Sequence, residues 1–445
     1  MKRRHLLAGS AAVMAAPAVL RAASAQSRTE VTFWHGLANP LGLEVERVCT
    51  RFNDSQSTYK VNPVFKGGYV ETLTSAVAAW RAGQAPHIVQ MFEVGTGSML
   101  AAGPAVKQVW QLFEETGVAV DAEQYLPGVR GYYSTADGKL ASMPFNSSTT
   151  VVWYNKDAFR KAGLNPDAFP KTWPELVEAA RKLKAANATP TPVSTAWPTW
   201  AHFEQYSAIH DLPFSTLSNG FEGLGTELKI NSAPHVKHLN RLLEMAKEGT
   251  FRYGGRDNAG EVLFPSGEAA VMFTSSGFRA RVSREAKFDW GVAMLPNDPE
   301  VRAEPINSVI GGASLWVMTA PSRTPAEYKA VAEFFKFISQ PENDAEWHQR
   351  TGYVPITHGG FEVSKKQGFY EKNPGADIPI LQLTRGTMTA NSRGFRLGRF
   401  VEIRNIIQEE MEKSLQGNQN AQQALDSAVQ RGNRVLREFE RTNRT

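Results

Sequence analysis

The sequence predicts an α/β fold with two lobes, and three observations support this prediction. Short strand-like runs alternate with amphipathic helices along the body of the chain. The chain has 445 residues, and at about 150 residues per domain this length predicts two or three domains. No stretch rich in Pro, Gly and Ser divides the chain into two parts. We therefore expect discontinuous lobes that several crossings of the chain join.

The opening of the chain indicates a βαβαβ unit. Residues 31–34, 59–65 and 87–92 form the expected strands, and residues 70–82 form one of the two expected helices. The other helix is marked by apolar side chains at helical spacing: Leu41, Val45, Val48, Cys49 and Phe52. Strands that run parallel need crossovers of this kind, so we expect a parallel or mixed sheet.

Later elements continue the same alternation. Capping boxes at residues 172–175 and 324–327 predict two helix starts, each with Thr at the N-cap and Glu three residues on. Residues 270–273 and 313–318 are expected strands, and apolar residues from 421 to 439 predict a long terminal helix. The expected first lobe comprises residues 26–144 and 278–338. The expected second lobe comprises residues 145–277 and 339–445.

The first 25 residues have the three parts of an export signal. Lys2, Arg3 and Arg4 are the basic part, residues 6–20 are the apolar part, and small residues precede a cleavage site after Ala25. The apolar part is shorter than the roughly 20 residues that span a bilayer. We expect a cleaved signal peptide and a periplasmic protein. The arginine pair also suits twin-arginine export, with an ordinary basic leader as the alternative.

Charge and cysteine content exclude several classes of protein. The formal net charge is +5, but the leader holds four basic side chains and no acidic ones. The remainder is nearly neutral, which argues against a nucleic-acid-binding protein. The single cysteine excludes an intrachain disulfide and a multi-cysteine metal cage. An exported bacterial protein of this kind is commonly a hydrolase or a solute-binding protein.

The motifs of a hydrolase are missing from the sequence. Ser275 does not lie in a G-x-S-x-G elbow, and there is no H-E-x-x-H motif, phosphate-binding loop or dinucleotide fingerprint. His235 and His238 could share a metal, but neighbouring Lys237 favours a solvated helix surface. Paired carboxylates for glycoside hydrolysis stay open, because such a pair need not be close in the chain. We therefore expect a protein that is not an enzyme and binds neither a metal nor a cofactor.

Aromatic and small polar residues form the pattern of a binding site instead. Trp197 and Trp200 bracket a Pro-Thr turn and could form an apolar wall beneath a polyol, or could simply fill the interior of a lobe. Residues 145–149 place four short polar side chains between two strands, which suits a hinge, a ligand contact or an irregular edge strand.

Several turns could present donors to an anion. Ser275 follows a strand and precedes a helix, where it could bind an anion or cap the helix. Gly311 and Gly312 would let backbone N–H groups approach a ligand or would simply form a turn. Glu93 follows a strand at the carboxyl end, where open α/β sheets bind ligands, although an ordinary loop acid would also fit.

Longer strings of sequence resemble the periplasmic sn-glycerol-3-phosphate-binding proteins of ATP-binding-cassette (ABC) importers, within the extracellular solute-binding protein family 1. The resemblance covers essentially the whole chain after the leader. The two most specific strings are Ile-Gly-Gly-Ala-Ser-Leu-Trp at 310–316 and Phe-Tyr-Glu-Lys-Asn-Pro-Gly-Ala-Asp at 369–377. Further strings lie at 33–35, 85–86, 93–96, 144–149, 154–159, 346–349, 351–353 and 422–429.

The resemblance implies a maltose-binding-protein-like fold, with a multi-strand hinge and a ligand in the cleft between two lobes. It implies nine ligand-binding residues: Tyr69, Glu93, Ser148, Trp197, Trp200, Ser275, Gly312, Tyr353 and Arg404. Four of them, Ser275, Gly312, Tyr353 and Arg404, are assigned to a phosphate, with Ser148 close to it. Glu93 and Tyr69 are assigned to glycerol hydroxyls, and the two tryptophans to the apolar wall. Phe92 departs from the expected tyrosine, which bears on the polarity of the cleft.

The function that the resemblance implies is capture without catalysis. The ligand would be glycerol 3-phosphate or a glycerophosphodiester such as glycerophosphocholine. The partner would be an inner-membrane ABC permease with a cytoplasmic ATPase, and the binding protein would be a monomer. A sugar or oligosaccharide receptor of the same fold is the first alternative. A periplasmic hydrolase and a cell-surface interaction protein are the rivals from other classes.

Overall fold

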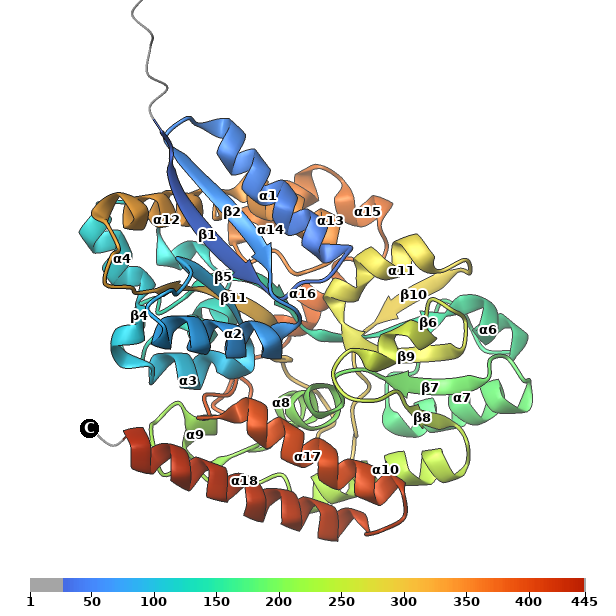
Figure 1. The fold of residues 1–445 in the computed structure, drawn as a ribbon. Coiled ribbons are helices and arrows are strands. Elements are labelled where there is room, and N and C mark those ends of the chain that lie inside the picture. The colour runs from blue at the N-terminus through green and yellow to red at the C-terminus, as the bar shows by residue number, and fades with distance from the viewer. Residues whose placement is uncertain (1–26, 444–445) are drawn as a thin grey trace, which may run out of the picture.

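The computed structural model describes residues 27–443. The expected signal peptide, its cleavage site after Ala25 and the arginine pair lie outside the described residues. Within them, no helix is both long enough and apolar enough to cross a membrane. Two sheets organise the chain, one in each lobe (Figure 1).

The sheet of the first lobe is mixed, as the opening of the sequence predicts. Its strand order is β2–β1–β3–β11–β4, and β5 also pairs with β11. β1 is parallel to β2 and to β3, whereas β11 runs antiparallel to β3 and β5. The bounds are β1 Thr29–His35, β2 Tyr59–Phe65, β3 Ile88–Phe92, β4 Val106–Lys107, β5 Met143–Ser148 and β11 Gly311–Met318.

The sheet of the second lobe has the order β10–β6–β9–β7–β8. β6 and β9 are antiparallel and buried along most of their length, while β7 runs parallel to both of its neighbours. The bounds are β6 Thr150–Asn155, β7 Thr191–Thr195, β8 Phe251–Tyr253, β9 Ala269–Ser275 and β10 Trp290–Ala293.

Helices cover both sheets (Figure 1). The helices before β5 are α1 Leu41–Ser55, α2 Tyr69–Arg81, α3 Thr96–Leu100, α4 Val109–Thr116 and α5 Pro127–Tyr133. Those between β6 and β11 are α6 Lys156–Lys161, α7 Trp173–Ala185, α8 Gln205–Ile209, α9 Thr216–Gly220, α10 Ala233–Lys247 and α11 Arg279–Glu285. The remaining helices are α12 Pro325–Ile338, α13 Pro341–Thr351, α14 His358–Lys366, α15 Phe369–Lys372, α16 Ile378–Leu383, α17 Phe400–Leu415 and α18 Ala421–Asn443. Both predicted capping boxes are present, at the starts of α7 and α12.

The segment labelled α9 is a left-handed turn rather than a right-handed helix. Leu217, Ser218 and Asn219 have φ values of 54, 51 and 55°, and Gly220 continues at 86°. Such a run is costly for residues that carry a Cβ. The Asn219 side chain supports it by accepting a hydrogen bond from the N–H of Ser215 at 3.0 Å.

The chain passes between the lobes at positions that differ in part from the prediction. β5 gives way to β6 at Thr149, close to the expected boundary of 144/145. The expected first-lobe segment 278–338, however, contains β10, which pairs with β6 of the second sheet. The crossing therefore lies between β10 and β11. α13 packs against α1 of the first lobe although residues 339–445 were expected in the second. Hydrophobic patterning shows that an element is buried but not which sheet buries it.

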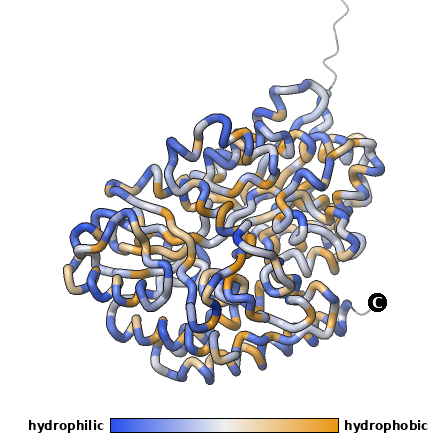
Figure 2. Tube along the Cα trace, turned by 180° about the vertical axis from the view of Figure 1, so that it is seen from behind, coloured by the Kyte–Doolittle hydropathy of each residue, from blue (hydrophilic) through white to orange (hydrophobic). Residues whose placement is uncertain are grey.

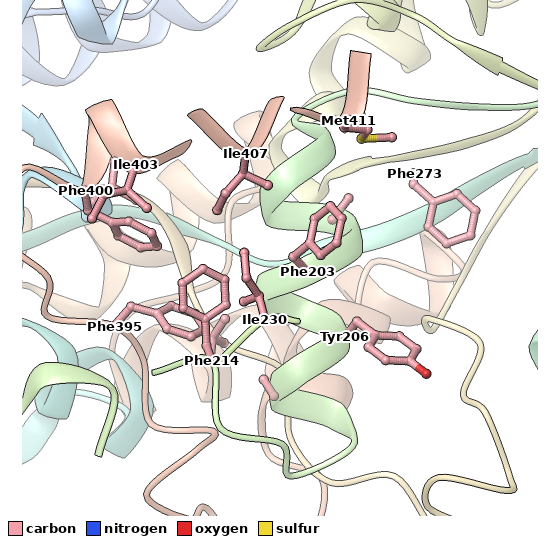
Figure 3. Packing of buried hydrophobic residues seen from close by; sticks show 14 of the residues in the cluster. Phe203, Tyr206, Phe214, Ile230, Phe273, Phe395, Phe400, Ile403, Ile407 and Met411 are labelled. Carbon is pink, nitrogen blue, oxygen red and sulfur yellow. The ribbon is translucent and has the colours of Figure 1, made fainter. Parts of the chain in front are cut away.

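The core of the second lobe surrounds a fully buried helical segment. A π-helix over Trp200–Glu204 continues into α8, and both are buried throughout. Figure 3 shows Phe203 from this segment below Ile407 and Met411 of α17, and Tyr206 belongs to the same cluster of buried residues. Seen along the whole chain, hydrophobic segments run through the interior and hydrophilic ones follow much of the outline (Figure 2). Cys49 is buried in the first-lobe core, as its helical spacing predicts.

The expected solvated surface at His235 and His238 is wrong. Both side chains are fully buried, together with His202 and His210. His238 stacks on Tyr206 with ring centroids 4.3 Å apart, and His235 hydrogen-bonds Ser207 and Ser232. Lys237 pairs with Glu300 instead. A charged residue next to the two histidines in the sequence therefore did not indicate that their face of the helix is exposed.

We predict that this histidine cluster makes stability fall as the pH falls. Burial lowers the pKa of His202 and His235 to about 3 and that of His210 to about 4, against about 6.5 in an unfolded chain. The stabilising contribution is complete above pH 6.5 and declines below it, by up to about 1.4 kcal/mol per pH unit for each proton. Urea unfolding from pH 7 to 5 measures the slope. His202→Phe should reduce the slope; an equal slope in wild type and variant would contradict the prediction.

Candidate functional site

A cavity of about 600 Å³ lies between the two lobes. It receives residues from the ends of first-sheet strands, from the chain crossings and from the buried helical segment of the second lobe. All nine residues that the resemblance singles out line it: Tyr69, Glu93, Ser148, Trp197, Trp200, Ser275, Gly312, Tyr353 and Arg404. Positions far apart in the sequence thus converge on one cavity.

The crossings of the chain bring three small polar positions together. Ser148 ends β5, where it lies opposite Gly311 in the pairing with β11. Ser275 ends β9, where it lies opposite Thr150 of β6. Because β6 follows β5 directly, the ends of both sheets meet here and present the backbone and hydroxyl groups of Ser148, Ser275 and Gly312 to the cavity.

Ser275 also caps the turn that follows it. Its Oγ accepts a hydrogen bond from the N–H of Gly277 at 3.1 Å. The capping interpretation of this serine is therefore confirmed. A hydroxyl that accepts one hydrogen bond still has its own proton to donate, so capping leaves Ser275 able to donate to a ligand oxygen.

Two glycines at the start of β11 allow close packing around the cavity. Gly312 has φ +85°, and a Cβ there would lie 1.9 Å from the carbonyl oxygen of Asn146. At Gly311 a Cβ would lie 2.2 Å from the ring of Trp200. The two glycines could form a turn or admit a ligand, according to the sequence. In the structure, Gly312 packs closely against the neighbouring strand and Gly311 packs closely against a tryptophan of the cavity.

Aromatic rings form one wall of the cavity. Trp200 is buried, whereas Trp197 is half-buried and has φ 52°, with its N–H donating to the carbonyl of Asp257 at 2.6 Å. Tyr69 stacks on Phe92 with ring centroids 5.2 Å apart, and its ring lies 6.5 Å from that of Trp197. The phenylalanine at 92 thus contributes a stacking surface where a tyrosine was expected.

The only arginine among the nine predicted residues pairs with two carboxylates. Arg404 of α17 donates from Nε and Nη2 to the two carboxylate oxygens of Glu204, each at 2.7 Å. Its Nη2 also donates to Oε1 of Glu93 at 2.5 Å. Glu204 lies on the π-helix of the second lobe and Glu93 follows β3 of the first lobe. One guanidinium therefore links the lobes.

Burial makes this trio electrostatically demanding. All three side chains are at most 8% exposed. Burial opposes the charge on Arg404, but Glu204 and Glu93 outweigh it and raise the pKa of the guanidinium. Burial raises the pKa of Glu93, with Arg404 acting in the opposite direction. Two carboxylates against one guanidinium leave this end of the cavity without excess positive charge. The assignment of Arg404 to a phosphate stays a prediction.

Five acidic residues at the cavity were missed by sequence reasoning. Four of them, Glu71, Asp257, Glu261 and Glu285, line the cavity, and the fifth, Glu204, pairs with the cavity residue Arg404. Thr274 donates to Glu261 at 2.8 Å, and burial raises the pKa of Glu261 to about 7. Glu204 had a usable signal, since it lies seven residues after Trp197 and four after Trp200, on one helical face. Within residues 27–443, no group of three or more His, Cys, Asp or Glu residues is placed to hold a metal ion.

The fold and the interlobe cavity are those of a solute-binding protein, and comparison with known proteins agrees. Residues 47–376 match the model of the bacterial extracellular solute-binding protein family. The chain belongs to this family. It is 44% identical to the sn-glycerol-3-phosphate-binding periplasmic protein UgpB of Pectobacterium atrosepticum, over 100% of this chain and 99% of that protein. It is 45% identical to UgpB of Yersinia enterocolitica over 95% of each chain.

Solved structures support the fold. UgpB of Mycobacterium tuberculosis in complex with glycerophosphocholine superposes with a TM-score of 0.76 at 22% identity, covering 93% of this chain and 99% of that one. The cyclic alpha-maltosyl-1,6-maltose binding protein of Arthrobacter globiformis gives 0.73 at 21% identity, covering 93% and 100%. The predicted maltose-binding-protein-like architecture is confirmed.

We predict that Gly311→Ala disturbs the cavity by displacing Trp200. The added methyl group would overlap the indole ring, so the ring must move into the cavity or the start of β11 must shift. Overpacking of this kind costs about 1–3 kcal/mol. The expected result is a lower melting temperature with altered tryptophan fluorescence. Gly128→Ala, where a Cβ meets nothing within 4 Å, is the matched control. Unchanged fluorescence in Gly311→Ala would contradict the packing described here.

Proposed function

We propose that this protein is the substrate-binding component of an ABC importer and captures glycerol 3-phosphate or a glycerophosphodiester in the periplasm. The observation that carries the proposal is the convergence of all nine expected residues on one interlobe cavity. The full-length similarity to sn-glycerol-3-phosphate-binding periplasmic proteins supports the same ligand class. Capture would end in delivery of the unchanged ligand to an inner-membrane permease powered by a cytoplasmic ATPase, with the binding protein acting as a monomer.

Two sets of lining residues suit the two parts of such a ligand. Ser148, Ser275, Tyr353 and the N–H of Gly312 offer neutral donors for a phosphate, and the guanidinium of Arg281 also lines the cavity. The carboxylate oxygens of Glu93 would accept hydrogen bonds from the glycerol hydroxyls.

Arg404 belongs to the glycerol end in this proposal. Its guanidinium is bonded to Glu93, so the two side chains share one end of the cavity. A phosphate placed there would face two carboxylates within a few ångströms, which is unfavourable in a poorly hydrated site. The indole rings of Trp197 and Trp200 then lie along the carbon chain of the ligand, which gains apolar contact without losing hydrogen bonds.

The cavity has room for the head group of a diester. A glycerophosphodiester carries a substituent on the phosphate, and the cavity of about 600 Å³ exceeds what a glycerol phosphate alone requires. The relative from M. tuberculosis has been solved with glycerophosphocholine. We infer that the ligand class extends from the monoester to such diesters.

Binding would work by closure of the lobes. Residues of both lobes line the cavity, so a ligand that touches both stabilises the closed arrangement over the open one. No covalent step is needed, and the ligand leaves unchanged.

Calorimetry tests the proposal directly. We expect glycerol 3-phosphate and glycerophosphocholine to bind and maltose not to bind. Ser275→Ala should weaken both phosphate ligands by about 10- to 150-fold, as expected for removal of one hydrogen bond to a charged group. Ser266→Ala, at a turn remote from the cavity lining, is the matched control. Binding of maltose without either phosphate compound, or turnover of glycerophosphocholine, would contradict the proposal.

A further inference from the structure

Glu204 is the member of the interlobe trio that the binding assignments do not include. It is fully buried on the π-helix between Trp200 and α8, and it makes two hydrogen bonds to Arg404 through separate oxygens. These two bonds fix both the position and the plane of the guanidinium, because a two-point contact between planar groups restricts rotation.

The other hydrogen-bond donors of Arg404 are available for contacts with the first lobe and with a ligand. Nη2 also reaches Glu93 on the first lobe, at 2.5 Å. Nη1 makes no hydrogen bond with any residue of the described chain, and Arg404 lines the cavity. With Nε and Nη2 committed, Nη1 is the donor left for a ligand oxygen.

We propose that Glu204 is a positioning residue for ligand recognition: it holds Arg404 so that one guanidinium both joins the lobes through Glu93 and presents Nη1 to the hydroxyl end of the ligand. Two consequences follow. The ion pair to Glu93 favours the closed arrangement before ligand binds. The two carboxylates also keep phosphate away from this end, so Glu204 helps to orient the ligand. The second consequence rests on the function proposed above, and the first does not.

The local backbone explains why Glu204 can perform this task. A π-helix widens the helical turn, and such bulges often occur at functional sites. Here one π-turn carries Trp200 toward the cavity and Glu204 toward Arg404. An ordinary helical turn would rotate these two side chains relative to each other, so the widened turn sets their joint orientation.

The first experiment compares two ligands. Wild type, Glu204→Gln and Glu204→Asp are titrated with glycerol 3-phosphate and with ethyl phosphate, a phosphate monoester without hydroxyl groups. We expect Glu204→Gln to reduce the preference for glycerol 3-phosphate at least about fivefold while ethyl phosphate binds within about twofold of wild type. Glu204→Asp, which keeps the charge, should recover part of the preference.

A matched control separates positioning from general stability. Glu410 is also a buried glutamate in an ion pair with arginine, Arg431, but it lies between α17 and α18 and does not line the cavity. Glu410→Gln should lower stability without changing the ligand preference. An equal loss for both ligands in Glu204→Gln, or an unchanged preference, would overturn the proposal.

The second experiment needs no ligand. Small-angle scattering of the ligand-free protein should give a larger radius of gyration for Glu204→Gln than for wild type, because the interlobe ion pair loses its support. Glu410→Gln should match wild type. Equal radii for Glu204→Gln and wild type would overturn the closing role of Glu204. If wild type binds neither phosphate ester, the proposed function fails while this measurement still decides the role of Glu204.

Discussion

The structure depends on one buried guanidinium that joins its two lobes. Arg404 is held by Glu204 within the second lobe and reaches Glu93 in the first. Removing one partner of a buried ion pair commonly costs about 3–5 kcal/mol, because it leaves an uncompensated charge away from water. Arg404, Glu204 and Glu93 therefore hold one another in position. They do so where the two lobes must meet to enclose a ligand.

The second constraint is the way in which the chain passes between the sheets. β5 runs into β6 and the loop after β10 runs into β11, so strand ends from both sheets meet at the cavity. Gly311 and Gly312 permit this close approach, since a side chain at either position would overlap Trp200 or the neighbouring strand. The neutral donors of the site thus come from the connection between the lobes. In the proposed function, a hinge that also carries ligand contacts would couple binding to closure.

Most of the fold could be predicted from local patterns. The structure contains the expected βαβαβ unit, both capping boxes and the helix with the buried cysteine. Apolar periodicity and capping predict such elements because each depends only on residues close together in the sequence. The positions of the crossings could not be predicted in the same way. β10 and α13 carry no local signal that assigns them to one lobe, and only long-range pairing shows that β10 joins β6 and that α13 packs on α1.

The candidate site could likewise be predicted only in part. The nine lining residues came from resemblance to a family, and the structure brings them into one cavity. The pairing of Arg404 with two carboxylates was not visible, because Glu93, Glu204 and Arg404 lie far apart in the sequence and a lone arginine on a helix usually faces solvent. That pairing is the reason for proposing that the arginine recognises hydroxyl groups, whereas the resemblance implied phosphate recognition.

A crystal structure of the complex with glycerol 3-phosphate tests the central claim most directly. The account predicts the phosphate within hydrogen-bonding distance of Ser275 and the N–H of Gly312, and the glycerol hydroxyls beside Glu93 and Arg404, with the contact between Arg404 and Glu204 retained. A phosphate bound to the guanidinium of Arg404, or a ligand bound outside the cavity between the lobes, would contradict it.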